Sequence, residues 1–205
     1  MRPMAIAAVA GLLAAGAAAL PAAAEDHHHK SMEAAPPARG DSIYALPASL
    51  VDQRGRPVGL DLFRGHPVLI SMFYATCPDA CPLLIADLQR IERELPVRIR
   101  ADLRIVLVSL DPGRDTPEVL QALARRRHVD ESRWRLVRAP DDTVREIAAL
   151  LGIKYRRLPD GNFNHSSIIT LLDPEGVVLA RDDAIGGPHT ALLRSLQSAQ
   201  SAPRR

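Results

Sequence analysis

The most constraining feature of this sequence is a pair of cysteines, Cys77 and Cys81, between an apolar run and a leucine-rich segment. The run from Val68 to Tyr74 predicts a buried strand, and residues 83–95 predict a helix because leucine and isoleucine recur at helical spacing. We therefore expect both thiols where a strand ends and a helix begins. A helix N-terminus carries free N–H groups and partial positive charge, which favour a thiolate. Thiolates are redox nucleophiles and metal ligands, so this position suits either chemistry.

These are the only cysteines in the chain, and a structural disulfide between them is the alternative to a functional pair. Closing a loop of about five residues stabilises a protein by about 2 kcal/mol, against about 4.7 kcal/mol for a hundred-residue loop. A disulfide that holds a fold together would join more distant segments. The spacing therefore favours a functional pair.

Strands and helices alternate along the rest of the chain. Further strands are expected at 104–110 and 134–137, and a β-hairpin at 167–181. Further helices are expected at 116–128, 142–151 and 189–200, the first of them capped by Asp115 or Thr116. A turn at Asp52 to Gly55 precedes them all. This order predicts an α/β sandwich, with a mixed central sheet, flanking helices and a C-terminal β-hairpin.

The N-terminus has the pattern of an export signal. Arg2 precedes an apolar, alanine-rich run to Leu20, and Ala22 to Ala24 give small residues at an A-x-A site. We expect a signal peptide at 1–24, a histidine-containing leader at 25–42, one domain at 43–200 and a tail at 201–205. An uncleaved anchor in the inner membrane is the alternative. The expected location is an oxidising, exported compartment, the periplasm.

The charge pattern excludes one class of partner. The formal net charge is +2, and arginines are scattered among acidic residues instead of being clustered with aromatic residues. Nucleic-acid binding therefore has no support.

Two thiolates need a third ligand to make a good site for copper or zinc, and neutral imidazole is suitable. His165 lies in a polar segment at 161–167 that leads into the predicted hairpin. Loops at one end of neighbouring strands converge in an α/β sheet, but position alone leaves open whether His165 reaches the thiols. The other histidines have ordinary explanations in turns, at a helix end or in the leader; they are His27, His28, His29, His66, His128 and His189.

Several segments together resemble the Sco/SenC family of copper-delivery proteins, which have a thioredoxin-like fold. In the family's order, these are Leu50 to Gly55, Cys77 to Pro82, Ser109 to Pro117, and Asn164 to Ser167 followed by Leu172 to Gly176. The resemblance covers residues 43–198. It implies that Cys77, Cys81 and His165 bind copper, as Cu(I) or Cu(II), for assembly of cytochrome c oxidase. It also implies an acceptor subunit of a terminal oxidase, a thiol-reductant protein and other copper chaperones as partners.

The sequence departs from the family pattern at two places beside the site. The common Phe-Gly-Tyr-Thr before the first cysteine is replaced by residues 73–76, Phe-Tyr-Ala-Thr. The common Val-Asp before the histidine is replaced by Phe163 and Asn164, which removes a carboxylate. The expected ligands are unchanged, whereas the acceptor that the protein serves is open. Tyr74 and Phe163 are expected to form a wall of the site or to belong to the core.

Two other functions remain open. A thiol–disulfide reductase would use Cys77 and Cys81 as a redox-active pair, although C-x-x-x-C differs from the C-x-x-C of thioredoxin-like redox motifs. A peroxide-sensing module would need an arginine near the reactive thiol, and Arg114 could serve. Asp111, Arg114 and Asp115 are expected either to contact the thiol region or a partner, or to cap a helix and form a surface ion pair.

The leader suggests a second copper site. Cleavage after Ala24 would give the N-terminus Glu25-Asp26-His27, in which the amine, two amide nitrogens and an imidazole form a planar set that suits Cu(II). His28, His29 and Met32 follow and could receive the ion. A solvated histidine-rich tail is the alternative.

Overall fold

The computed structural model describes residues 42–77 and 80–201. The predicted signal peptide, the possible copper site at His27 and the end of the predicted tail lie outside these residues. No helix in the described part of the chain combines the length and the apolar character that crossing a membrane requires.

The centre of the fold is a seven-stranded mixed sheet with the strand order β2-β1-β5-β4-β3-β8-β9. Strands β3, β4 and β5 run parallel to one another. At one edge β1 and β2, and at the other edge β8 and β9, pair antiparallel with their neighbours. Their bounds are β1 Leu50–Asp52, β2 Pro57–Val58, β3 Val68–Phe73, β4 Arg104–Ser109, β5 Trp134–Arg138, β8 Ile169–Leu172 and β9 Val178–Asp182. The predicted mixed sheet and C-terminal hairpin are confirmed.

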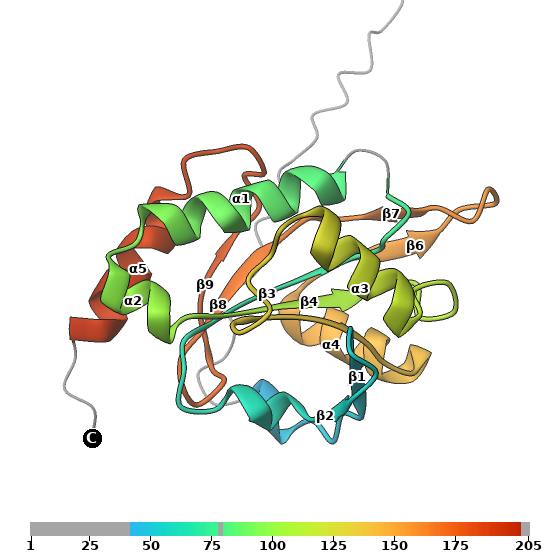
Figure 1. Ribbon diagram of the computed structural model, residues 1–205, viewed down its shortest axis with the longest axis horizontal. Coiled ribbons are helices and arrows are strands. Elements are labelled where there is room, and N and C mark those ends of the chain that lie inside the picture. The colour runs from blue at the N-terminus through green and yellow to red at the C-terminus, as the bar shows by residue number, and fades with distance from the viewer. Residues whose placement is uncertain (1–41, 78–79, 202–205) are drawn as a thin grey trace, which may run out of the picture. The chain divides into compact units, whose positions relative to one another are not determined.

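Helices cover both faces of this sheet (Figure 1). One face is covered by α1, α2, α3 and α5, and the other by α4 with two short 3-10 helices. The bounds are η1 Ile43–Ala45, η2 Leu60–Phe63, α1 Ala80–Glu94, α2 Val97–Asp102, α3 Pro117–Arg126, α4 Asp141–Leu151 and α5 Thr190–Ser201. The result is a three-layer α/β sandwich.

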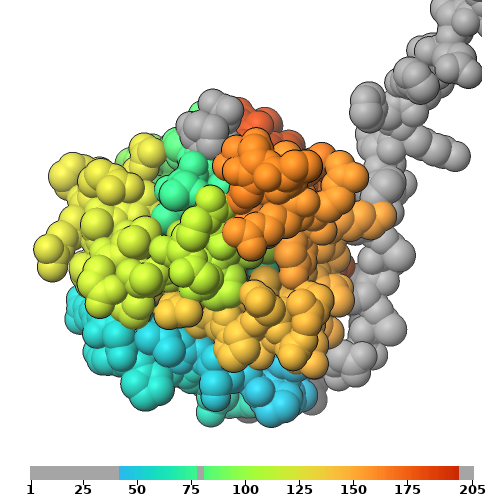
Figure 2. All heavy atoms as spheres, turned by 90° about the vertical axis from the view of Figure 1, so that its right-hand side faces the viewer, coloured from blue at the N-terminus to red at the C-terminus, as the bar shows by residue number. Residues whose placement is uncertain are grey.

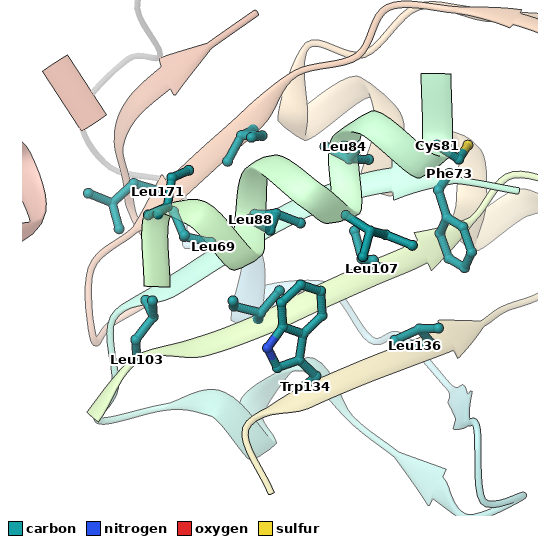
Figure 3. Close-up of a cluster of buried hydrophobic side chains, with 14 of the residues drawn as sticks. Leu69, Phe73, Cys81, Leu84, Leu88, Leu103, Leu107, Trp134, Leu136 and Leu171 are labelled. Atoms are coloured by element: carbon teal, nitrogen blue, oxygen red, sulfur yellow. The ribbon is translucent and has the colours of Figure 1, made fainter. Parts of the chain in front are cut away.

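The central strands are apolar on both sides because each side meets a helical layer. In β3, Leu69 and Phe73 face the α1 layer, whereas Ile70 and Met72 face the α4 layer. Figure 3 shows Leu84 and Leu88 of α1 packed toward the first of these faces. Burying one such side chain contributes about 1.5–3 kcal/mol, so this packing fixes α1 and its first turn against the sheet.

The ends of α3 and α4 agree with the predicted caps, whereas α1 begins earlier than predicted. The side chain of Thr116, and not Asp115, caps α3 by accepting from the N–H of Val119. Helix α4 ends at Gly152, which adopts a left-handed φ of 72°. Helix α1 begins at Ala80, earlier than the leucine spacing predicts, so Cys81 lies inside its first turn.

The structure also contains elements that the sequence did not predict. Helix α2 follows α1 directly, and a separate two-stranded sheet pairs β6, Tyr155–Arg157, with β7, Phe163–His165. The sequence predicted that His165 lies in a loop, whereas the structure places it in a short strand. In Figure 1 this small hairpin extends beside the N-terminal end of α1.

Candidate metal centre

Backbone hydrogen bonds place the two thiols at the end of β3. The N–H of Cys77 donates to the carbonyl of Tyr74 at 3.2 Å, which closes a turn directly after the strand. The N–H of Tyr74 lies 3.5 Å from Cys81 Sγ, and the N–H of Cys81 lies 3.4 Å from Cys77 Sγ. Each sulfur thus receives a backbone N–H, as expected where a strand meets a helix.

The two thiols differ in their exposure to solvent. Cys81 is 4% exposed and belongs to the hydrophobic core, whereas Cys77 is only partly buried. Burial raises the pKa of the Cys81 thiol well above its ordinary value, and the neighbouring Cys77 and Asp115 raise it further. At Cys81, burial therefore opposes the thiolate that the helix N-terminus favours. A bound cation would offset the cost of burying a negative sulfur at Cys81, and the thiol proton would be released when the ion binds.

His165 approaches the thiols from β7. It pairs with Tyr155 in the two-stranded sheet, and its ring meets the ring of Tyr74 edge-on at a centroid distance of 5.9 Å. Its Nδ1 lies 3.3 Å from the carbonyl of Ser166, so Nδ1–H donates there and Nε2 keeps its lone pair. Burial lowers the pKa of His165, which favours the neutral imidazole that can bind a metal.

The ligand atoms of Cys77, Cys81 and His165 all lie within 4.8 Å of one another. Among the described residues, this is the one group of three or more cysteine, histidine or acidic side chains that could hold a metal ion. Two sulfurs and an imidazole suit a soft or borderline ion. The structure thus brings together the three residues that the sequence indicated.

Aromatic side chains form a wall of the site. Tyr74 is buried, and its ring lies 5.3 Å from the ring of Phe163, which also packs against Tyr155 at 6.3 Å. Phe163 and His165 are on the same face of β7 because side chains alternate along a strand. Asn164 between them is exposed. The residue that replaces the family's carboxylate therefore faces away from the thiols.

The loop from Asp111 to Asp115 contacts both halves of the site. Asp115 is fully buried, and its carboxylate accepts from the N–H of Ala75 at 3.0 Å and from the Ser109 hydroxyl at 2.5 Å. Arg114 pairs with Asp111 and donates to the carbonyl of Gly161 in the β6–β7 hairpin. Figure 2 shows this loop, in lime, bordering the orange hairpin. The motif thus does more than cap a helix and form a surface ion pair.

The remaining described histidines have other roles. His66 pairs with Asp102 at 2.7 Å, and buried His189 lies between Asp182 at 3.0 Å and Asp87 at 3.3 Å. His128 follows the C-cap of α3 with a φ of 51°. None of the three joins the cysteines in the metal-ligand group.

The sequence did not reveal the supporting contacts of Asp115 and Arg114, although the motif that contains them was noted. Each contact joins residues far apart in the chain, 40 positions for Asp115 and Ala75 and 47 for Arg114 and Gly161. The small β6–β7 sheet brings Gly161 near Arg114. Its sequence has no strand pattern, so these contacts could not be predicted.

Comparisons with known proteins agree on one family. The sequence model of the SCO1/SenC family matches residues 37–197. The SCO2-like protein RP587 of Rickettsia prowazekii is 29% identical over 136 residues, which cover 63% of this chain and 64% of that protein. The chain therefore matches somewhat less than two thirds of that relative's length.

Solved structures share the fold. Arabidopsis thaliana ScoI with copper bound has a TM-score of 0.62 at 20% identity, covering 74% of this chain and 96% of that one. BsSco, a member of the Sco family of cytochrome c oxidase assembly proteins with a disulfide switch, has a TM-score of 0.64 at 22% identity, covering 76% and 92%. The predicted thioredoxin-like fold is confirmed. With the family model matching most of its length, this chain belongs to the SCO1/SenC family.

Proposed function

We propose that this protein carries one copper ion on Cys77, Cys81 and His165 and delivers it to a copper centre of a respiratory oxidase. The observation that carries the proposal is the convergence of two sulfurs and one imidazole nitrogen within 4.8 Å. Copper bound to Arabidopsis ScoI and the role of the Sco family in oxidase assembly support the choice of metal and of pathway.

The donor set explains both carriage and release. Thiolates bind Cu(I) well, and the imidazole adds a ligand that also suits Cu(II). Three protein ligands leave an open coordination position, at which a ligand from the acceptor can bind the ion before the carrier's own ligands dissociate. Cys77 is the more exposed of the two thiols and is the natural side for this exchange.

We infer that the acceptor is the subunit with the binuclear copper A site of a terminal oxidase. The carrier would act after export to the periplasm, free if its signal peptide is cleaved and anchored to the inner membrane if it is not. A thiol reductant would keep Cys77 and Cys81 reduced for loading, and another copper chaperone could supply the ion.

The same thiols support a second function, reduction of an acceptor's disulfide. The partly exposed Cys77 thiolate would attack one sulfur of that disulfide and release the other as a thiolate. The buried Cys81 would then lose its proton and attack Cys77 Sγ in the mixed disulfide, which breaks the bond to the acceptor and releases the acceptor's second sulfur as a thiolate. The acceptor thus gains two electrons, and Cys77 and Cys81 become a disulfide. A dithiol reductant would restore them. The observation that favours this function is the pairing of one accessible and one buried thiol.

Copper transfer and disulfide reduction can be separated with one acceptor, the isolated copper A domain of an oxidase. Copper-loaded protein is mixed with the reduced apo-domain, and the copper content of each is measured after separation. Copper-free, reduced protein is mixed with the oxidised domain, and acceptor thiols are counted. Transfer in the first mixture supports the carrier; thiols without any copper transfer would instead support the reductase. Cys77→Ser should fail in both.

A further inference from the structure

A groove lined with arginines lies between α1 and the segment that follows α3. Its volume is about 590 Å³, and Arg93, Arg100, Arg127, Arg133 and His128 line it. The side chain of Gln89 on α1 donates to the carbonyl of Arg127 at 2.7 Å, which fixes the two walls together. Figure 1 shows α1 and α3 over the same face of the sheet. The groove is therefore part of the folded domain.

The acidic residues of the groove are already engaged. Glu92 accepts from the indole N–H of Trp134 at 2.8 Å and pairs with Arg133 at 3.1 Å. Arg133 also pairs with Asp130 at 2.8 Å. Arg133 thus holds these two carboxylates in place and offsets part of their negative charge.

Two exposed guanidinium groups remain. The side chains of Arg93 and Arg127 are exposed, and the described residues offer neither of them a hydrogen bond or an ion pair. Both face a concave surface, where a ligand with several carboxylates could meet them together. Arginine is the side chain best suited to such contacts, because its planar group can bind a carboxylate through two parallel hydrogen bonds.

A small pocket that contains the thiols adjoins the groove at Arg127. Arg127 also lines the small pocket that contains Cys77 and Cys81, together with Arg126 of α3. A molecule held by Arg93 and Arg127 would therefore extend toward the more exposed sulfur, Cys77.

We propose that this groove binds an acidic segment of the protein that exchanges copper or electrons with the thiols. Carboxylates of the segment would pair with Arg93 and Arg127, and the adjoining part of the partner would reach Cys77. What is exchanged rests on the proposed function, whereas the preference for carboxylates rests on the groove alone. Attraction between opposite charges would speed the encounter and orient the partner.

Binding of hexaglutamate to the copper-free, reduced protein tests the proposal. Trp134 is the only tryptophan in the chain, and its contact with Glu92 makes its fluorescence a reporter on the groove. We expect saturable binding by calorimetry, with a change in Trp134 emission. Binding should weaken by about tenfold or more when Arg93→Glu and Arg127→Glu are combined. It should disappear at about 1 M salt, where the screening length is about 3 Å.

A matched control carries the same change in net charge at another site. Arg145→Glu with Arg156→Glu alters a second cationic groove beside β6 and should leave hexaglutamate binding within about twofold of the unaltered protein, since distant charges are largely screened. Absence of saturable binding, or equal losses in the two double variants, would overturn the proposal. Circular dichroism of both variants checks that the fold is kept. The assay uses no copper, so its failure is distinct from failure of copper binding.

Discussion

The two halves of the candidate copper site are built very differently. The thiol half stands on the main sheet: β3 is buried along its whole length, and Cys81 is part of the hydrophobic core. The histidine half stands on a small two-stranded sheet outside the main one, where β7 has no fully buried residue. One half is thus fixed by the core and the other by a few specific contacts.

Those contacts are the aromatic packing of Phe163 on Tyr74, the bond from Arg114 to Gly161, and two bonds between Lys154 and Ser166. Elements with few buried contacts open more readily than core elements. We therefore expect the cysteines to set the affinity for copper, and the hairpin to tune the geometry and the preferred oxidation state. The following predictions test this division, from the largest effect to the smallest.

Loss of a thiol should have the largest effect. Cys77→Ser and Cys81→Ser each remove a soft ligand, and the described residues offer no fourth cysteine, histidine or acidic group at the site to replace it. Affinity for Cu(I) should fall by more than about 100-fold, since even residues that only orient ligands cost 10–100-fold. Competition with a chromophoric Cu(I) chelator measures this. Similar affinities for the serine variants and the unaltered protein would show that copper binds elsewhere.

Loosening the hairpin should have a smaller effect. Arg114→Ala removes the bond to Gly161 and should weaken Cu(II) binding by about tenfold, the lower end for residues that orient a metal ligand. Arg145→Ala, which breaks an exposed pair with Asp142, is the matched control and should leave binding unchanged.

A double-mutant cycle decides whether Arg114 acts through His165. In a His165→Ala background, Arg114→Ala should cause no further loss of Cu(II) affinity, because no ligand remains to be positioned. Additive losses in the double variant would mean that Arg114 acts elsewhere.

Oxidation of the thiol pair should change stability only moderately. The loop is short, so the Cys77–Cys81 disulfide should add about 2 kcal/mol or less, which corresponds to a rise in Tm of about 4–8 °C for a domain of this size. Thermal unfolding of the oxidised and reduced apoprotein measures the difference. Loss of the folded state on reduction would instead indicate a structural disulfide.

Asp115 should give a small dependence of stability on pH. Burial raises its pKa above the ordinary value of 3.8, so the folded state retains its proton longer than the unfolded state does. Its contribution is therefore complete below about pH 3.8 and is lost as the pH rises through the folded pKa. Asp115→Asn should flatten the urea-unfolding free energy across this window. An unchanged pH profile in the variant would argue against the raised pKa.

The same contrast explains what could be predicted from the sequence. The strand before Cys77, the helix that contains Cys81 and the strands beside them carry strong hydrophobic patterns, because they are buried on one or both faces. The β6–β7 hairpin carries none: Arg156 and Arg157 are exposed, and the strands are three residues long. His165 could therefore be placed near the thiols only through the family resemblance.

The pKa of Cys81 could not be read from the sequence either. A helix N-terminus favours thiolate, but the extent of burial depends on packing of α1 against β3 and α3, which is a property of the whole domain. The supporting role of Asp115 was hidden in the same way, since its partners come from β4 and from the turn after β3.

The most direct test of the copper site is a titration of the reduced protein and its His165→Ala variant with Cu(I) and Cu(II). The unaltered protein should bind about one equivalent of either ion, and Cu(II) should give a thiolate-to-copper absorption band. In the variant, Cu(I) should still bind to Cys77 and Cys81, while Cu(II) affinity falls and the band shifts. An unchanged affinity and spectrum in His165→Ala would contradict the assignment of the hairpin histidine as the third ligand.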